Sequence, residues 1–142
     1  MTSVDNTFAG LAITTAVVKG IQVPIACPTG WCNNDHTDEN TQNLDDIDHA
    51  GAHIDLMVPN LQGVDDLLFA YARLYQDTYA PDPLMRTPHI RIEFGGGEES
   101  YLTPDQADLF AARLAAFAAQ LQALAHTARN PGTAGSTEAT GC

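Results

Sequence analysis

The sequence predicts a single α+β domain, in which a mostly antiparallel sheet of about four strands packs against a long C-terminal helix and a shorter helix. Three observations support this fold class. Short apolar segments with alternating or β-branched residues recur over the first two thirds of the 142-residue chain. Residues 104–129 then carry apolar side chains at helical spacing. A hydrophobic content of 44% suffices for one core, and the length fits one domain.

Four segments read as strands. Residues 8–18 are rich in β-branched side chains, and residues 21–25 alternate apolar and polar. Lys19-Gly20 between them predicts a hairpin turn, and Pro24 indicates an edge strand because proline cannot donate to a ladder. The other two predicted strands are residues 52–58 and residues 89–94.

Two segments read as helices. Residues 64–79 have apolar side chains at helical spacing, which favours a short helix over a strand. The long helix begins after Thr103, where Pro104 fits the first helical position and Gln106 completes a capping box. Its apolar stripe would pack on the sheet, or it could pair with a second copy in a homodimer. The stripe consists of Ala107, Phe110, Leu114, Phe117, Leu121, Leu124 and Ala128.

The charge is strongly acidic, with 18 Asp and Glu against 6 Lys and Arg. No Lys or Arg lies between Lys19 and Arg73, a gap that contains nine acidic residues. Such a surface repels phosphates, so we expect no direct nucleic-acid binding. It suits another protein with a basic surface or a cation, although an acidic loop can also serve solubility alone.

No apolar run approaches the roughly 20 residues of a membrane span. The N-terminus lacks the basic region of a signal peptide, so we expect a cytoplasmic protein with no membrane contact. We expect the domain to cover residues 1–129. Residues 130–142 have the composition of a flexible C-terminal tail.

The segment from Cys27 to His53 contains two cysteines and three histidines, which is a ligand inventory for one zinc ion. Residues 29–50 within it are polar and have no apolar pattern of their own. Loops of this length are uncommon in compact domains unless something holds them. The sequence therefore predicts a metal-pinned loop over residues 27–53.

Four residues are the predicted zinc ligands: Cys27, Cys32, His36 and His49. The cysteines are separated by four residues, and Pro28 and Gly30 favour a tight turn between them. His36 lies close enough to join the same loop. His49 would close the loop before the next strand, whereas His53 is the alternative fourth ligand.

Residues around the predicted site have supporting roles. Asp48 is a weaker candidate ligand, and either Asp46 or Asp48 could hydrogen-bond an imidazole and fix its tautomer. Trp31 would cover the site or anchor the loop to the core. Four protein ligands predict a structural ion rather than a catalytic one.

The arrangement resembles a family of small actinobacterial proteins of unknown function with the motif Cys-Pro-x-Trp-Cys-x-x-x-His. The matching residues are Cys27-Pro28, Trp31-Cys32 and His36, then residues 45–49 and the helix start at residues 102–105. This chain has Thr29-Gly30 where the family has one residue. The resemblance covers roughly residues 17–129, implies a metal site and implies no activity.

Three functions are compatible with these residues. The first is a non-enzymatic zinc-stabilised protein, with one structural ion, that acts as a regulatory or protein-interaction module. The second is a small metal-dependent hydrolase in which Asp46, Asp48 or Asp55 is the base. The third is a thiol redox sensor based on Cys27 and Cys32, although the pair lacks the Cys-x-x-Cys spacing of thioredoxin-like proteins.

Overall fold

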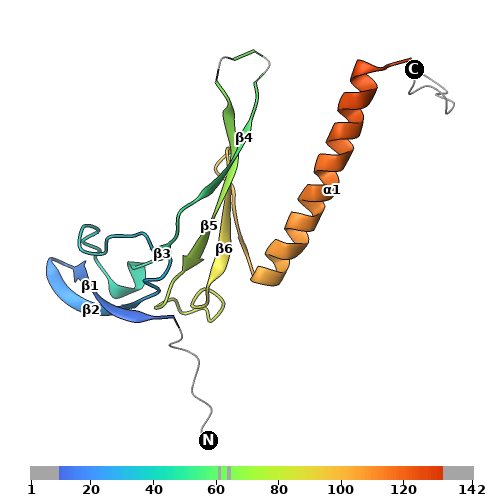
Figure 1. Cartoon of the computed structure of the whole chain (residues 1–142). Coiled ribbons are helices and arrows are strands. Elements are labelled where there is room, and N and C mark those ends of the chain that lie inside the picture. The colour runs from blue at the N-terminus through green and yellow to red at the C-terminus, as the bar shows by residue number, and fades with distance from the viewer. Residues whose placement is uncertain (1–9, 61, 64, 133–142) are drawn as a thin grey trace, which may run out of the picture. The chain divides into compact units, whose positions relative to one another are not determined.

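The computed structural model describes residues 10–60, 62–63 and 65–132 and has the predicted α+β class. Among these residues it contains antiparallel sheets and one long helix, which Figure 1 shows, and a 3-10 turn over Leu44–Asp46. The chain divides into two compact units, Met1–Pro104 and Asp105–Cys142. All strands and all four predicted metal ligands lie in the first unit.

The first sheet is the predicted hairpin of β1 (Ala12–Val18) and β2 (Ile21–Cys27). Lys19 and Gly20 both have positive φ, at 51° and 76°, which matches the two-residue turns that suit twisted hairpins. Pro24 lies opposite Thr15. Because hydrogen-bonded and non-bonded pairs alternate from the turn, this pair is non-bonded and the missing N–H of proline costs nothing.

The second sheet has five strands: β3 (His49–Ala50), β4 (Ile54–Val58), β5 (Leu67–Gln76), β6 (His89–Phe94) and β7 (Glu99–Leu102). β3 and β4 pair one after the other with the long β5, and β6 and β7 follow as a meander. The predicted antiparallel sheet is thus confirmed, as are the predicted strands within residues 52–58 and 89–94, but the strands divide between two sheets instead of one.

β5 replaces the short helix predicted over residues 64–79, so that prediction was wrong. The segment fits both periods: Tyr71, Arg73 and Tyr75 also alternate along one face of a strand. β4 pairs with one edge of β5 and β6 pairs with the other. These ladders satisfy the backbone from both sides, so tertiary pairing decides between two compatible local patterns.

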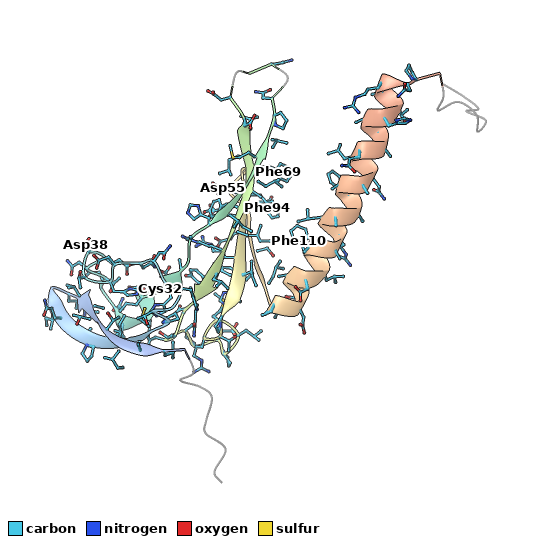
Figure 2. The ribbon with its side chains drawn as sticks, viewed as in Figure 1. Cys32, Asp38, Asp55, Phe69, Phe94 and Phe110 are labelled. Carbon is cyan, nitrogen blue, oxygen red and sulfur yellow. The ribbon has the colours of Figure 1, made fainter. Side chains whose placement is uncertain are left out.

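The register of β5 shifts at Phe69, which is an extra residue between Leu68 and Ala70 opposite β4. Its carbonyl accepts a hydrogen bond from Gly95 at 2.9 Å. A Cβ at Gly95 would lie 2.8 Å from the Leu68 carbonyl oxygen, which explains the glycine at the end of β6. Figure 2 labels Phe69 on β5 and Phe94 on β6.

A small apolar core lies under the hairpin. Ala16, Ile25 and Ile47 are each 1% exposed, and Val18, Val23 and Tyr79 pack against them. The Tyr79 hydroxyl also accepts a hydrogen bond from the Ala26 amide at 3.1 Å. The core therefore joins β1 and β2 to the segment just before β3 and to the segment after β5.

The predicted long helix is confirmed as α1 (Pro104–Arg129), and none of its 26 residues is buried. Among the described helices, none combines the length and the hydropathy needed to cross a bilayer. The tail predicted for residues 130–142 lies outside the described residues from position 133 onward.

Candidate metal centre

The four predicted ligands come together at one point of the first unit. Cys27 ends β2, Cys32 and His36 lie in the segment between β2 and β3, and His49 begins β3. One potential ligand atom from each residue lies within 4.8 Å of the other three. Among the described residues, this is the one such group of three or more Cys, His, Asp and Glu side chains.

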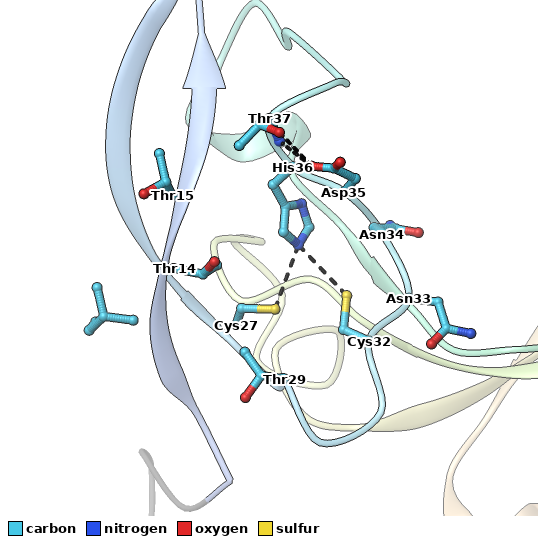
Figure 3. A pocket seen from close by; sticks show the side chains of 11 residues that line it. Thr14, Thr15, Cys27, Thr29, Cys32, Asn33, Asn34, Asp35, His36 and Thr37 are labelled. Atoms are coloured by element: carbon cyan, nitrogen blue, oxygen red, sulfur yellow. Dashed lines mark hydrogen bonds between the residues drawn. The ribbon is translucent and has the colours of Figure 1, made fainter.

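The separations of these atoms match the edges of a tetrahedron around one ion. His36 Nε2 lies 3.6 Å from Cys27 Sγ and 3.7 Å from Cys32 Sγ, as Figure 3 shows. His49 Nδ1 lies 3.7 Å from Cys32 Sγ. An ion about 2.3 Å from sulfur and about 2.0–2.1 Å from nitrogen separates two such atoms by about 3.6 Å. Three sulfur–nitrogen separations thus fit such a site, and the cluster could hold a metal ion.

A tight turn brings the two sulfurs together. The Pro28 carbonyl accepts hydrogen bonds from the amides of Trp31 and Cys32, at 3.1 and 2.9 Å. Gly30 in this turn is unconfined, since a Cβ added there would meet nothing within 4 Å. The four-residue separation of Cys27 and Cys32 is thus compatible with convergent thiols.

The second nitrogen of each histidine has a hydrogen-bond partner. His36 Nδ1 lies 3.2 Å from Glu39 Oε2, and His49 Nε2 lies 3.2 Å from Thr78 Oγ1. If each of these nitrogens carries the proton, His36 Nε2 and His49 Nδ1 are left with lone pairs that face the sulfurs. Such outer partners are typical of metal-binding histidines.

These partners correct one prediction, because neither Asp46 nor Asp48 bonds an imidazole. Asp46 accepts a hydrogen bond from the Asn43 side chain at 3.2 Å. Asp48 Oδ1 accepts from Asn34 at 3.1 Å, and its Oδ2 accepts from the Tyr75 hydroxyl at 2.9 Å. Asp48 therefore ties the segment before β3 to β5 and positions the neighbouring His49.

The segment of residues 28–48, called the ligand loop below, is held to strands on both sides. The Val17 amide donates to the His36 carbonyl at 3.0 Å, and the Thr41 amide donates back to Val17 at 3.1 Å. On the other side, the Asn33 amide donates to the Ala50 carbonyl at 2.9 Å. The loop has few apolar residues, so these bonds and the ligand cluster define its path.

Burial disfavours the charged forms of two members of the cluster, Cys27 and His49. It raises the pKa of the Cys27 thiol to about 12, with further contributions from Cys32 and Glu39. Burial, followed by the nearby His36, lowers the pKa of His49 to about 4. A divalent cation reverses this preference for the thiol, since metal binding requires thiolate and releases protons.

His53 and Trp31 lie outside the cluster. The His53 side chain is 52% exposed and lies 3.5 Å from Asp55, so among the two alternatives only His49 joins the other candidate ligands. The Trp31 ring lies against Gly51, where an added Cβ would be 3.6 Å from Cε3. Trp31 thus contacts the segment after β3.

Sequence reasoning missed Glu39 and Thr78 as partners of the histidines. Glu39 was detectable in principle, because it follows His36 by three residues. Thr78 was not, because it lies 29 residues beyond His49 and reaches it only through the pairing of β3 with β5.

Comparisons with known proteins give a family but no described activity. Neither the curated proteins nor the solved structures yielded a match to this chain. One family model covers residues 11–130, which include every strand, all four candidate ligands and α1. The chain therefore belongs to the family described as Domain of unknown function (DUF6907).

Proposed function

We propose that this protein is a non-enzymatic interaction module whose ligand loop is stabilised by one zinc ion. The convergence of two thiols and two imidazoles, with sulfur–nitrogen separations of 3.6–3.7 Å, carries the proposal. Thiolate and imidazole donors in a tetrahedral arrangement suit zinc, whereas calcium and magnesium prefer oxygen ligands. The metal ligands in this proposal are Cys27, Cys32, His36 and His49.

The role of the ion in this proposal is structural. Catalytic zinc sites have three protein ligands and keep one position open for water, whereas structural sites use four. Here four candidate ligands are present, and His49, Cys27 and His36 are 0%, 3% and 4% exposed. An ion held by all four has no position left for a substrate.

The positions of the nearby carboxylates also argue against a hydrolase. Both oxygens of Asp48 accept hydrogen bonds, and Asp46 is bonded to Asn43. Asp55 lies beside the exposed His53, which is not in the ligand cluster. None of the three residues considered as a base is thus arranged to activate a water molecule on the ion.

The acidic composition supports a protein partner rather than nucleic acid. Between Lys19 and Arg73 the chain carries nine acidic residues and no basic one. A surface of this kind favours a partner with Lys and Arg and repels phosphates. Thiolate ligands require a reducing compartment, so we place the protein in the cytoplasm.

Metal analysis tests this proposal. Protein purified without chelator and without added metal should contain one equivalent of zinc, measured by inductively coupled plasma mass spectrometry. Cys32→Ser and His49→Ala should lose the ion, whereas the matched control His53→Ala should retain it. Wild-type protein without stoichiometric metal would overturn the proposal, as would full retention of zinc by His49→Ala.

A further inference from the structure

A cavity of about 570 Å³ lies beside the candidate metal centre, between β1 and the ligand loop. Residues 13–15 of β1 form one wall, and residues 33–37 of the loop form the other. Cys27, Thr29 and Cys32 complete the lining. Figure 3 shows this arrangement, with the Thr14 and Thr15 side chains on the strand and Asn33 to Thr37 on the loop.

The wall formed by β1 has unused backbone hydrogen-bonding groups. Val18 and Ile21 flank the two-residue turn, so the hydrogen-bonded pairs with β2 are those of residues 18, 16, 14 and 12. The N–H and C=O groups of Ile13, Thr15 and Val17 therefore point away from β2. An exposed strand edge of this kind is a template for another extended chain.

The ligand loop meets this edge at its turn end, where Thr41 bridges Val18 and the Thr41 carbonyl accepts from the Lys19 amide at 2.8 Å. Val17 donates to the His36 carbonyl and accepts from the Thr41 amide. Among the described residues, Ile13 and Thr15 make no corresponding backbone bond outside the hairpin. The loop and the edge thus meet from Val17 to Lys19 and bound an open stretch over residues 13–15, where Ile13 is 75% exposed.

The surroundings of this stretch favour a basic occupant. Asp35 lines the cavity, with Oδ1 held by the Thr37 amide at 3.0 Å and by the Thr37 hydroxyl at 2.6 Å. Asp38 and Glu39 follow in the same loop, and the loop contains no Lys or Arg. The threonine and asparagine side chains of the walls offer hydrogen bonds to a polar backbone.

We infer that this groove binds an extended segment of a partner protein that carries a Lys or Arg, and that the segment adds to β1 as a strand. Main-chain bonds to Ile13 and Thr15 supply affinity, and the carboxylate of Asp35 selects the basic side chain. The inference rests on the proposed function, because the metal ion holds the loop that forms the second wall. It names the interaction site of the module and the chemistry of its partner.

The experiment selects ligands from a random heptapeptide display library on the zinc-loaded full chain. Peptides enriched in Lys or Arg are expected, with amide chemical-shift changes in NMR spectra centred on Ile13, Thr15 and Asp35. N-methylation of alternate peptide amides should abolish binding, since main-chain donors make the contact. Enrichment of acidic peptides, or shift changes centred elsewhere, would overturn the inference.

A matched pair of proline variants tests the strand edge. Thr15→Pro removes an outward N–H directly opposite Pro24, which already occupies the equivalent outward position of β2. It should weaken peptide binding about fivefold or more, the range of one hydrogen bond. Gln22→Pro removes an outward N–H from the opposite edge and should leave binding unchanged. Equal effects of the two variants would contradict the assignment.

Two further measurements keep the outcomes separable. Asp35→Asn retains the acceptor for Thr37 and should weaken binding of basic peptides while flattening its salt dependence. Zinc content is measured on every sample. If the protein holds stoichiometric zinc and selects no peptide, the inferred peptide binding in the groove is wrong and the proposed function stands. If zinc is absent, the proposed function is wrong.

Discussion

The hairpin–loop region, residues 12–50, contains a small buried core, whereas most large apolar side chains described in the β4–β5 ribbon, residues 54–72, are exposed. The hairpin also has exposed apolar residues, since Ile13 and Ile21 are 75% and 65% exposed. Ile25 and Ile47 in the first region are 1% exposed, whereas Ile54, Leu67 and Phe69 in the second are 75%, 55% and 54% exposed. The second region is nevertheless the richer in large apolar side chains. We attribute the burial of Ile25 and Ile47 to the small core of the hairpin and to the candidate metal centre beside it.

The largest expected effect is loss of the metal ion. Structural zinc contributes about 10–16 kcal/mol of apparent binding free energy, which is comparable with the stability of a whole domain. Chelation or Cys27→Ser should therefore unfold residues 27–50 and leave β5 and β6 paired. Hydrogen exchange checks this: the Asn33 and Thr41 amides should lose protection, whereas the Gly95 amide should keep it.

The same experiment can break the comparison. Loss of protection at Gly95 together with Asn33 would mean that both regions unfold as one cooperative unit. Unchanged exchange at Asn33 and Thr41 after complete removal of zinc would mean that backbone bonds and the small core suffice for the loop.

The next largest expected effect on stability comes from a pair of isoleucine substitutions. Ile25→Ala should destabilise the protein by about 2–5 kcal/mol, because it opens a cavity in the hairpin core. Ile54→Ala, also within a strand, should change the free energy of unfolding by about 0.5 kcal/mol or less if the exposure of Ile54 persists in solution. Urea denaturation of the two variants measures the difference.

Comparable losses for the two variants would show that Ile54 is covered in solution. The two regions would then differ in what covers their apolar side chains, and not in whether those side chains are buried.

The success of prediction also differs between the regions. The candidate ligands could be predicted because Cys27, Cys32 and His36 are close in sequence, and because thiols in a polar loop have few other roles. The choice of His49 over His53 depended on the position of the loop end, and the cluster contains His49. Local chemistry was sufficient here.

The β4–β5 ribbon depends on pairing that a local pattern does not encode. Residues 67–75 have the helical spacing that favoured a helix, but they also fit a strand period, and the ladders with β4 and β6 decide between the two. Thr78 and Tyr75 were missed for the same reason, since both reach the loop across strand pairs. Sequence reasoning thus failed where long-range contacts define the structure.

Substitution of the hydrogen-bond partners of His36 and His49 should have a smaller effect, on the affinity for zinc. Glu39→Gln and Thr78→Val should each weaken zinc binding about 10–100-fold, because each removes or weakens the bond that orients an imidazole. Competition with a chromophoric chelator measures the affinity. Asp38→Asn is the matched control, since it changes the loop charge without a bond to either histidine. An equal loss in this control would assign the effect to loop charge.

The smallest expected effect concerns Tyr75, which lies on β5 beyond the ribbon and bonds the hairpin–loop region. Its hydroxyl donates to Asp48 at 2.9 Å, and Asp48 precedes the candidate ligand His49. Tyr75→Phe removes this bond and should cost about 1 kcal/mol in the free energy of unfolding, measured with urea near neutral pH. Asp48 is half-buried, so water can replace the lost donor and limit the cost.

The pH dependence of this difference identifies its origin. Burial, followed by the charge of Asp48, raises the pKa of Tyr75 above its ordinary value of about 10. The protonated phenol is thus favoured in the folded state, and its contribution is complete below pH 10 and is lost as the pH rises above that value. The stability difference between wild type and Tyr75→Phe should therefore shrink in alkaline solution. A constant difference would mean that Tyr75 acts through packing alone, and that the bond to Asp48 does not couple the ligand loop to β5.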